Sequence, residues 1–461
     1  MGAESFDVIV IGGGPGGIAA AIRAAQLGGR VALIEQEDLG GLCMNRGCIP
    51  LCHMMVASSI LGHIALGKEM GLMSQGLEKD YSLLIKRQQA LIEFMRQGAE
   101  AMLRKNAVRI VRGRGRLEGT GRVSVNKEVI FGKNIILATG GRWTRSDLPG
   151  GDSKGISNSD YLLSAKALPR RCLVYGGGPI SLEIAQFLKR FGSEVFLVTE
   201  HKSLLHGESK AVRSRLSKAL QKEGIKVYTK TRIQSLEKKK NELHCLLKSG
   251  EDDEKIVVGR LFTVERQADL TDLGLTTVGL ETDGPFLEVN ERMQTSVDGV
   301  YAVGDISAPE TMAYSHAASA GGIIAAENAM GLDSKFDTRI IARVAFTQPQ
   351  VACVGYTKKE AKKAGYDVIA GTAPLSMNPL GMILSQNEGI IEVVSEKKYG
   401  EILGIHIVGE NAAEMAGQAV LAMHMELYLE ELARVPFPHP TLSESLPEAA
   451  RDALGRAIYL P

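Results

Sequence analysis

The sequence has no surplus of charge of one sign, few cysteines and no long apolar run. Its 54 Lys and Arg residues stand against 53 Asp and Glu, which gives a formal net charge of +1. A protein whose main ligand is a phosphate backbone carries a basic excess instead. No uninterrupted apolar run approaches the roughly 18 residues that span a bilayer. We therefore expect neither nucleic acid nor a membrane among its partners.

Only six cysteines occur in 461 residues, far too few for a disulfide scaffold. Three of them, Cys43, Cys48 and Cys52, are clustered, which indicates chemistry. The N-terminus shows no basic segment followed by a cleavable apolar core, because residues 6–11 lead directly into glycines, as a buried strand does. These features favour a cytoplasmic protein.

Glycine is abundant, with 52 residues against 15 prolines. Residues 8–35 are typical of a strand, a glycine turn, a helix and a second strand. The motif Gly12-x-Gly14-x-x-Gly17 lets pyrophosphate approach the backbone at a helix N-terminus, and Glu35 follows where a carboxylate accepts hydrogen bonds from a ribose diol. The alternative is a turn that packs without a ligand, which Glu35 makes the weaker interpretation.

A second unit of this kind begins near residue 173, with Ser181 at the position of the third glycine. Glu200 stands at the end of its second strand, where a carboxylate repels a 2′-phosphate. We therefore expect NAD rather than NADP, although His201 and Lys202 follow. The candidate nucleotide contacts are Gly176, Gly178, Glu183, Thr199 and Glu200.

Cys43 and Cys48 lie immediately beyond the first dinucleotide motif. In an ideal helix their Cα atoms would be about 8.6 Å apart, beyond the roughly 4.4 to 6.8 Å that a disulfide tolerates. A bridge would need a distorted turn, for which Gly47 supplies backbone freedom. A strained, accessible disulfide of this kind is suited to exchange. Two inert, reduced cysteines, as is usual in the cytosol, are the alternative.

His439 and Glu444 meet the physical requirement for a base near a disulfide. An imidazole titrates close to neutral pH, and a carboxylate partner orients it and raises its basicity. Most histidines are structural or lie on the surface, so this interpretation depends on the setting, His-Pro-Thr-x-x-Glu.

Taken together, these motifs resemble the flavin-dependent pyridine nucleotide–disulfide oxidoreductases, and within that family the dihydrolipoamide dehydrogenase branch. The resemblance covers essentially the whole chain. It implies an α/β fold with two Rossmann-like dinucleotide-binding domains, for FAD and NAD, plus a C-terminal α+β dimerisation domain. The motifs that carry it, besides those above, are Ala138-Thr139-Gly140, residues 301–305, residues 346–355 and residues 439–444.

The resemblance also implies roles for particular residues. Cys48 would face the flavin and Cys43 would be the interchange thiol, with His439 and Glu444 reaching the disulfide of the other subunit of a homodimer. The expected substrate is dihydrolipoamide on a lipoyl-carrier protein or domain, oxidised with reduction of NAD. The implied FAD contacts are Gly12, Gly14, Gly17, Glu35, Gly41, Gly115, Thr139, Gly140, Asp305 and His316.

The sequence departs from the family pattern at three places. Cys52 stands where the family has a lysine beside the flavin, and Glu183, the partner of that lysine, is left to be protonated, turned to solvent or paired elsewhere. Cys52 is a third redox thiol or, the interpretation we favour, a small apolar filler. Ser181 and Glu265 replace glycines near the expected nicotinamide site, so NAD binding is supported less strongly than FAD binding.

The expected domains are 1–150 for FAD, 151–267 for NAD, 268–338 returning to the FAD domain, and 339–461 for dimerisation. Two alternatives remain open. One is a related flavoprotein reductase that acts on another disulfide. The other is a FAD-containing electron-transfer subunit with impaired NAD chemistry, which the departures favour and the retained cysteines, His439 and Glu444 oppose.

Overall fold

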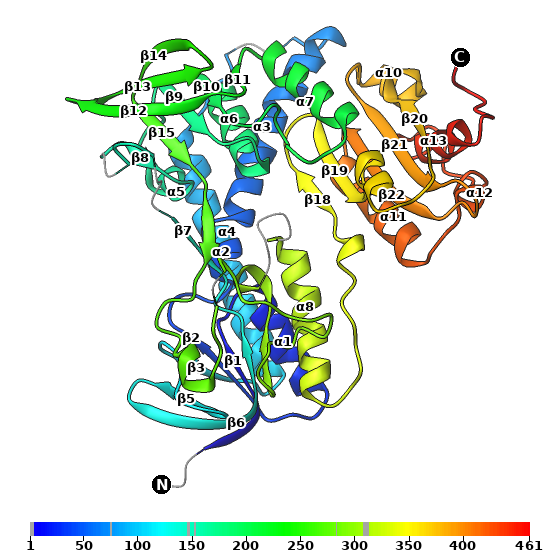
Figure 1. The fold of residues 1–461 in the computed structure, drawn as a ribbon. Coiled ribbons are helices and arrows are strands. Elements are labelled where there is room, and N and C mark those ends of the chain that lie inside the picture. The colour runs from blue at the N-terminus through cyan, green and yellow to red at the C-terminus, as the bar shows by residue number, and fades with distance from the viewer. Residues whose placement is uncertain (1–3, 74–75, 145–147, 152–153, 283, 308–312) are drawn as a thin grey trace. The chain divides into compact units, whose positions relative to one another are not determined.

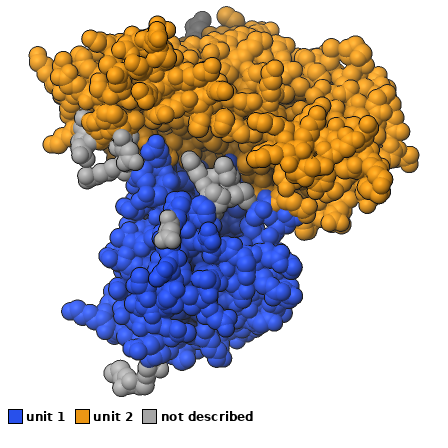
Figure 2. Space-filling view, viewed as in Figure 1, with its two compact units in different colours: residues 1–51, 82–144, 265–338 blue, residues 52–81, 145–264, 339–461 orange. Residues whose placement is uncertain are grey.

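A computed structural model describes residues 4–73, 76–144, 148–151, 154–282, 284–307 and 313–461. Two compact units make up the chain (Figure 2). The first comprises residues 1–51, 82–144 and 265–338, and the second residues 52–81, 145–264 and 339–461. The domain boundaries near residues 150, 267 and 338 remain predictions.

The first unit contains a seven-stranded sheet (Figure 1). Its strands run in the order β3-β2-β1-β6-β5-β4, with β17 pairing beside β6. Strands β1 and β2 are parallel and buried along most of their length, as expected of a sheet covered on both faces. Their bounds are β1 (Ser5–Ile11), β2 (Val31–Glu35), β3 (Arg109–Arg112), β4 (Arg116–Leu117), β5 (Arg122–Val125), β6 (Glu128–Leu137) and β17 (Val300–Ala302).

Helices α1 and α8 pack closely together in the first unit. Glycines permit this approach, because a Cβ atom on Gly322 would lie 2.2 Å from the carbonyl oxygen of Gly16. Strands β7 (Gly141–Trp143) and β16 (Arg266–Ala268) form a small antiparallel ribbon. The helices with residues in this unit are α1 (Pro15–Gln26), α2 (Gly41–Asn45), α3 (Cys48–Glu69), α4 (Tyr81–Lys105) and α8 (Ser315–Ala329), of which α3 extends into the second unit and α4 begins there.

The second unit holds a five-stranded parallel sheet in the order β11-β10-β9-β15-β8. A three-stranded antiparallel sheet, β12-β13-β14, packs beside it around a shared core. The strands are β8 (Ile156–Ser157), β9 (Arg171–Tyr175), β10 (Glu194–Val198), β11 (Lys226–Tyr228), β12 (Arg232–Lys239), β13 (Glu242–Ser249), β14 (Asp252–Val258) and β15 (Arg260–Thr263). The helices are α5 (Asp160–Ser164), α6 (Pro179–Arg190) and α7 (Lys210–Lys222).

The same unit contains a second five-stranded sheet, antiparallel, in the order β18-β19-β22-β21-β20. Helices α11 and α13 bury apolar side chains against one face of it. The elements are β18 (Arg343–Ala345), β19 (Gln350–Gly355), α9 (Lys358–Lys363), β20 (Val368–Pro374), α10 (Pro379–Ile383), β21 (Ile390–Glu396), β22 (Ile402–Gly409), α11 (Ala412–His424), α12 (Leu429–Leu432) and α13 (Ser445–Ala453). The predicted α/β class, with two βαβ units and an α+β segment, is confirmed.

One stretch, Gly41–Glu69, is long and apolar enough by composition to cross a membrane. Its most apolar 18-residue segment has a mean hydropathy of 1.6, and 28% of that segment is buried. Polar residues such as His53 and Ser58 interrupt it, which is why the sequence shows no unbroken apolar run. The core helices of proteins that never enter a membrane meet the same test.

Candidate active site

The first glycine turn joins β1 to α1 and has the close contacts that require glycine. Gly12 has φ +110°, and a Cβ atom there would lie 2.2 Å from the carbonyl oxygen of Ala138. A Cβ atom on Gly17 would lie 1.9 Å from the carbonyl oxygen of Gly12. The space around Gly14 is open, with only Gly41 within 4.0 Å. This leaves Gly14 as the residue over which a phosphate group can approach the backbone.

Glu35 is buried at the end of β2 and faces this turn. One carboxylate oxygen accepts a 2.6 Å hydrogen bond from the Gly13 amide, and the other accepts 2.7 Å from the Glu37 amide. Each oxygen has two acceptor sites, so the carboxylate is fixed in place and can still accept from a ribose diol.

The other residues predicted to contact FAD also lie in the first unit. Gly41 has φ +57°, and a Cβ atom on it would come within 2.9 Å of Gly14. Gly115 packs against Ile11, and the Thr139 hydroxyl donates to the carbonyl oxygen of Asp269 at 2.9 Å. The backbone carbonyl of neighbouring Gly140, at φ +73°, accepts from the Asp269 amide. These residues therefore form a tight, glycine-rich surface.

Asp305 and His316 have partners that the sequence did not reveal. The Arg266 guanidinium lies 3.0 Å from the Asp305 carboxylate, and the His316 ring lies 5.4 Å from that of Tyr314. Arg266 is distant in sequence, so no local motif predicts this ion pair. It places a positive charge on the same unit as the cysteines.

The chain between Cys43 and Cys48 departs from helical geometry as predicted. Helix α2 ends at Asn45, Arg46 has φ −140° and ψ −5°, and α3 begins at Cys48 itself. The two cysteines therefore lie on either side of a helix break. Their pairing as a redox disulfide stays a prediction.

Helix α4 holds this break in place, which sequence analysis missed. The Arg96 Nε donates to the Asn45 side-chain oxygen at 2.6 Å, and the Gln88 amide donates to the carbonyl oxygen of Pro50 at 2.8 Å. Asn45 in turn donates to the carbonyl oxygen of Gly41 at 2.9 Å. Both ends of the cysteine segment are thus tied to one helix.

The two thiols have opposite acidities. The pKa of Cys48 is lowered to about 6, chiefly because Cys43 hydrogen-bonds to it, with further contributions from Ser315 and Arg266. The pKa of Cys43 is raised far above its ordinary value by that same hydrogen bond and by burial. Cys48 Sγ lies 3.1 Å from the Ser315 Oγ, and Cys48 begins a helix, a position that favours a thiolate. These surroundings favour Cys48 as the thiolate of the reduced pair.

We expect alkylation of reduced Cys48 by iodoacetamide to rise as the pH passes about 6 and to level off near neutrality, because a thiol of lowered pKa is charged above it. Ser315→Ala removes a donor to the thiolate, so the profile should move to higher pH. Ser319→Ala, one turn further along α8, is the matched control. Peptide mass spectrometry across the pH range measures both, and a profile unchanged by Ser315→Ala would contradict the assignment.

The predicted pair of His439 and Glu444 is in contact. His439 Nδ1 lies 2.9 Å from one Glu444 oxygen, and the other oxygen accepts at 3.3 Å from the Asn378 side chain and from the Thr441 amide. The carboxylate is thus held from three sides, while the His439 side chain remains 65% exposed. This is the arrangement of an oriented, accessible base.

The second glycine turn, between β9 and α6, explains how Ser181 is tolerated. Gly176 has φ +131°, and a Cβ atom there would lie 2.5 Å from the Ser181 hydroxyl. The serine therefore fits only because position 176 has no side chain. The space around Gly178 is open, as for Gly14 in the first turn.

Glu183, left by the sequence with three possible fates, is paired elsewhere. Its side chain is buried, and the Phe346 amide donates to it at 2.8 Å. Glu183 thus has a structural partner that does not depend on the missing lysine.

The other two departures from the family pattern lie at Cys52 and Glu265. Cys52 is half-buried on α3. Glu265 is exposed, and its carbonyl oxygen accepts a hydrogen bond from the Thr144 amide at 3.0 Å.

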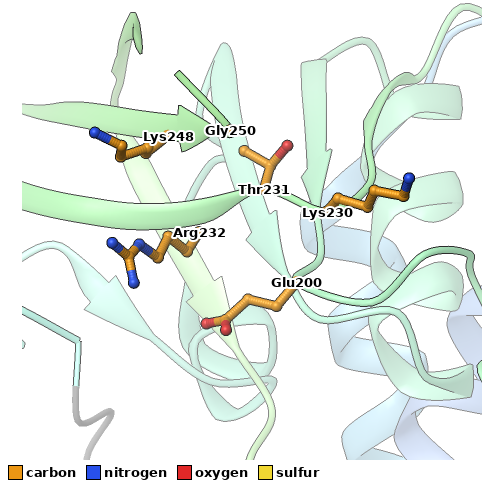
Figure 3. A pocket seen from close by; sticks show the side chains of 6 residues that line it. All are labelled: Glu200, Lys230, Thr231, Arg232, Lys248 and Gly250. Carbon is orange, nitrogen blue, oxygen red and sulfur yellow. The ribbon is translucent and has the colours of Figure 1, made fainter. Parts of the chain in front are cut away.

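A pocket opens beside the carboxyl end of β10 (Figure 3). Glu200 lies in it, and the Tyr175 hydroxyl donates to its carboxylate. Figure 3 shows the side chains of Glu200, Arg232 and Lys248 extending to the same side. Thr199 is buried and accepts from the His201 amide at 3.3 Å, so it supports the turn. The complete lining is Glu200, Lys230, Thr231, Arg232, Lys248 and Gly250.

If Glu200 holds the ribose of NAD, Glu200→Ala should raise the KM for NADH about tenfold or more, since a hydrogen bond to a charged group contributes about 1.5–3 kcal/mol. Glu200→Ala should also reduce the preference for NADH over NADPH, because Arg232 and Lys248 remain in the pocket and can attract a 2′-phosphate. Steady-state kinetics with both nucleotides measure this. Tyr175→Phe removes the hydroxyl that supports the Glu200 carboxylate and keeps the carboxylate itself, so it separates loss of that support from loss of the ribose contact. An unchanged KM for NADH in Glu200→Ala would place the nucleotide elsewhere.

The fold and the two glycine turns define a dinucleotide-dependent oxidoreductase. Residues 6–322 match the sequence profile of the family described as pyridine nucleotide-disulphide oxidoreductase, and residues 341–450 match its dimerisation domain. The chain belongs to the pyridine nucleotide-disulphide oxidoreductase family. This confirms the predicted family and its class, an enzyme that uses FAD and NAD.

The relatives include two proteins named dihydrolipoyl dehydrogenase. That of Thermus scotoductus is 38% identical over 462 residues, and that of Rhizobium etli is 33% identical over 482, each alignment covering 99% of both chains. The solved structure of LpdA from Mycobacterium tuberculosis has a TM-score of 0.87 at 22% identity, and that of the flavoprotein disulfide reductase RclA from Escherichia coli, in a Cu(II) complex, has 0.84 at 22%. Both structures cover 97% of this chain and 99% of their own, and show the likeness of fold.

Proposed function

We propose that the protein oxidises dihydrolipoamide to lipoamide with reduction of NAD. The observation that carries this proposal is the pair of Cys43 and Cys48 on either side of the helix break, with Cys48 at the start of α3 and 3.1 Å from the Ser315 hydroxyl, in a chain whose full-length relatives are named dihydrolipoyl dehydrogenase. The contact between His439 and Glu444 supports it, because oxidation of a dithiol needs a group that takes its proton.

The first unit fits FAD. Open backbone at Gly14 suits the pyrophosphate, and the fixed carboxylate of Glu35 suits the ribose. Bound there, FAD supplies the two-electron chemistry that links a dithiol to a pyridine nucleotide. The residues of the first glycine turn bind and orient it, and the second turn with Glu200 is proposed to hold NAD.

The proposed reaction is an exchange between the substrate dithiol and the disulfide of Cys43 and Cys48. A thiolate of the substrate attacks the Cys43 sulfur of the Cys43–Cys48 disulfide, the S–S bond breaks, and Cys48 leaves as a thiolate. The second substrate thiol then attacks the mixed disulfide, which releases the cyclic disulfide and Cys43. His439 accepts the proton of the first thiol, and the proton of the second passes to Cys43. The two electrons now on the cysteines reduce NAD⁺ to NADH, with release of a proton.

The low pKa of Cys48 and the high pKa of Cys43 fit these roles. A thiol of low pKa leaves a disulfide readily, so attack at Cys43 expels the better leaving group. Cys43 itself becomes a thiol that gains a proton. The asymmetry therefore favours the substrate meeting Cys43 rather than Cys48.

The chain carries the family's dimerisation domain, residues 341–450. We propose further that His439 and Glu444 of one subunit serve the cysteines of its partner in a homodimer, that the dithiol is carried on a lipoyl protein or domain, and that the protein is cytoplasmic. The cysteine usage supports the location, and the names of the relatives support the substrate.

An anaerobic assay tests the function. The holoenzyme is titrated with dihydrolipoamide and NAD⁺, then with NADH and lipoamide, and NADH absorbance is followed. Turnover in both directions is expected. Flavin reduction by NADH without any turnover of lipoamide, but with turnover of another disulfide, would favour a related reductase. Failure of NADH to reduce the flavin at all would favour an electron-transfer subunit.

A further inference from the structure

A row of polar side chains crosses the antiparallel sheet of the second unit. The strand register pairs Arg343 with Cys353, Cys353 with His406, and His406 with Glu392. Residues opposite one another on neighbouring strands share a face of a sheet. The alternating neighbours Ala352, Val354, Ile405 and Ile407 belong to the apolar core under α11 and α13, so the polar row lies on the opposite face.

Glu208, just before α7, joins this row. The Arg343 guanidinium contacts both of its carboxylate oxygens, at 2.6 and 2.9 Å. A carboxylate oxygen of Glu208, the Cys353 sulfur and a ring nitrogen of His406 all lie within 4.8 Å of one another. Cys353 and His406 are completely buried. Three groups of different ligand chemistry thus converge from separate segments of one unit.

The tautomer of His406 points to a ligand. Nε2 lies 3.0 Å from the carbonyl oxygen of Tyr356 and so must carry the proton. The lone pair is then on Nδ1, which is buried and has no hydrogen-bond partner among the described residues. A metal-binding histidine characteristically donates its other N–H to a backbone carbonyl, which fixes the ring for coordination. His406 has the same hydrogen bond to a carbonyl, which leaves Nδ1 as the nitrogen available to a cation.

The charges of the cluster are also suited to a cation. The Cys353 sulfur lies within 4.8 Å of a Glu208 carboxylate oxygen, and a cation bound between them would displace the thiol proton. One oxygen of Glu392, next to His406 in the row, is buried without a hydrogen-bond partner in the described structure. With Arg343 charged, the carboxylates of Glu208 and Glu392 leave one negative charge, and loss of the Cys353 proton on metal binding would add a second, which a divalent cation would neutralise.

We propose that Glu208, Cys353 and His406 form a Zn²⁺ site. Thiolate, imidazole and carboxylate together favour Zn²⁺, whereas Mg²⁺ and Ca²⁺ prefer oxygen ligands alone. Bonds of about 2.0–2.3 Å place tetrahedral ligands roughly 3.5 Å apart, so the three atoms, which lie within 4.8 Å of one another, approach by at most about 1.3 Å when the ion binds. Arg343 remains hydrogen-bonded to the carboxylate, and water completes the coordination. The site does not depend on the proposed function.

Such an ion would fasten the segment before α7 to strands β19 and β22. Glu208 comes from the chain that follows the parallel sheet, and the other two ligands come from the antiparallel sheet. Because the ion binds the folded state only, it should stabilise that state against heat. The expected effect of the ion is therefore on stability, and it is measured by spectroscopy and by thermal unfolding.

The test uses the full chain with Cys43, Cys48 and Cys52 replaced by serine, so that the clustered thiols cannot bind the probe. Metal-free protein is titrated with Co²⁺, a spectroscopic substitute for Zn²⁺. We expect about one equivalent to bind, with a near-ultraviolet thiolate-to-cobalt band that added Zn²⁺ removes. Zn²⁺ should also raise the unfolding temperature, and a chelator should reverse that rise.

Two further variants locate the site. Cys353→Ser in this background should lose the thiolate band, and His406→Gln should weaken Co²⁺ binding by more than about tenfold. Cys245→Ser, which replaces another buried thiol on β13, should behave like its parent. Lack of Co²⁺ and Zn²⁺ uptake by the parent would overturn the proposal even if a variant failed to fold. A thiolate band that survives Cys353→Ser would overturn it too.

Discussion

Serine at position 43 or at position 48 is expected to abolish oxidation of a dithiol substrate. A dithiol–disulfide relay needs two sulfurs, one that forms the mixed disulfide and one that leaves, and a hydroxyl does neither. Cys48 begins α3 and lies 3.1 Å from the Ser315 hydroxyl, which favours it as the sulfur that leaves, and Cys43 is the proposed partner of the mixed disulfide. Both variants should still bind FAD, because the first glycine turn and Glu35 are untouched. Turnover of dihydrolipoamide and flavin absorbance measure the two properties.

The matched controls are the chain's other cysteines. Cys172→Ser changes a buried thiol on β9 whose pKa burial raises to about 12, and it should leave turnover nearly unchanged. Cys52→Ser tests the third clustered thiol. Substantial lipoamide turnover by Cys43→Ser or Cys48→Ser would mean that the relay is misassigned. If that turnover disappeared when Cys52→Ser was added, Cys52 would be the substitute.

The βαβ units could be predicted because their signals are local. A run such as Val8 to Ile11 is apolar throughout and ends in glycines, and only a buried parallel strand followed by a tight turn accounts for both features. The residues that close the turn are also near in sequence, since Glu35 reaches back only to Gly13. Periodicity and spacing therefore predicted where the first glycine turn and its carboxylate lie in the chain.

The helix break at the cysteines could be predicted on the assumption that the two cysteines form a bridge. An unbroken helix holds residues five apart too far from each other for a bridge, and the chain leaves helical geometry at Arg46. The contacts that hold the break could not be predicted from the sequence. Arg96 is separated from Asn45 by 51 positions, and Ser315 is separated from Cys48 by 267. A hydrogen bond between distant segments leaves no periodic signal.

Glu183 also has a partner that is distant in the sequence and that the sequence could not predict. The sequence showed that its expected lysine is absent, and physical chemistry required a buried carboxylate to find another partner. The partner is a backbone amide 163 positions away, which belongs to no side-chain motif. The cluster of Glu208, Cys353 and His406 was missed for a similar reason, since each residue alone is unremarkable and only the strand register brings them together.

His439→Ala is expected to lower the rate of dithiol oxidation by roughly two to four orders of magnitude, the usual loss when a general base is removed. Glu444 orients the ring through Nδ1 at 2.9 Å, so Glu444→Gln should cause a smaller loss. His424→Ala, at the end of α11, is the control for loss of a histidine elsewhere. Pre-steady-state reduction by dihydrolipoamide measures the step, and a rate within a few-fold of the parent would remove His439 from the mechanism.

Mixed dimers test whether this base acts across subunits. Chains with His439→Ala and chains with Cys43→Ser are each expected to be nearly inactive alone. If the base of one subunit serves the cysteines of the other, a dimer of one chain of each kind has one site with both defects and one with neither. Co-expressed, differently tagged chains should therefore recover close to half of the parent's activity per mixed dimer. If base and cysteines came from the same chain, every site in the mixed dimer would carry a defect, so absence of recovery in a verified mixed dimer would contradict the shared site.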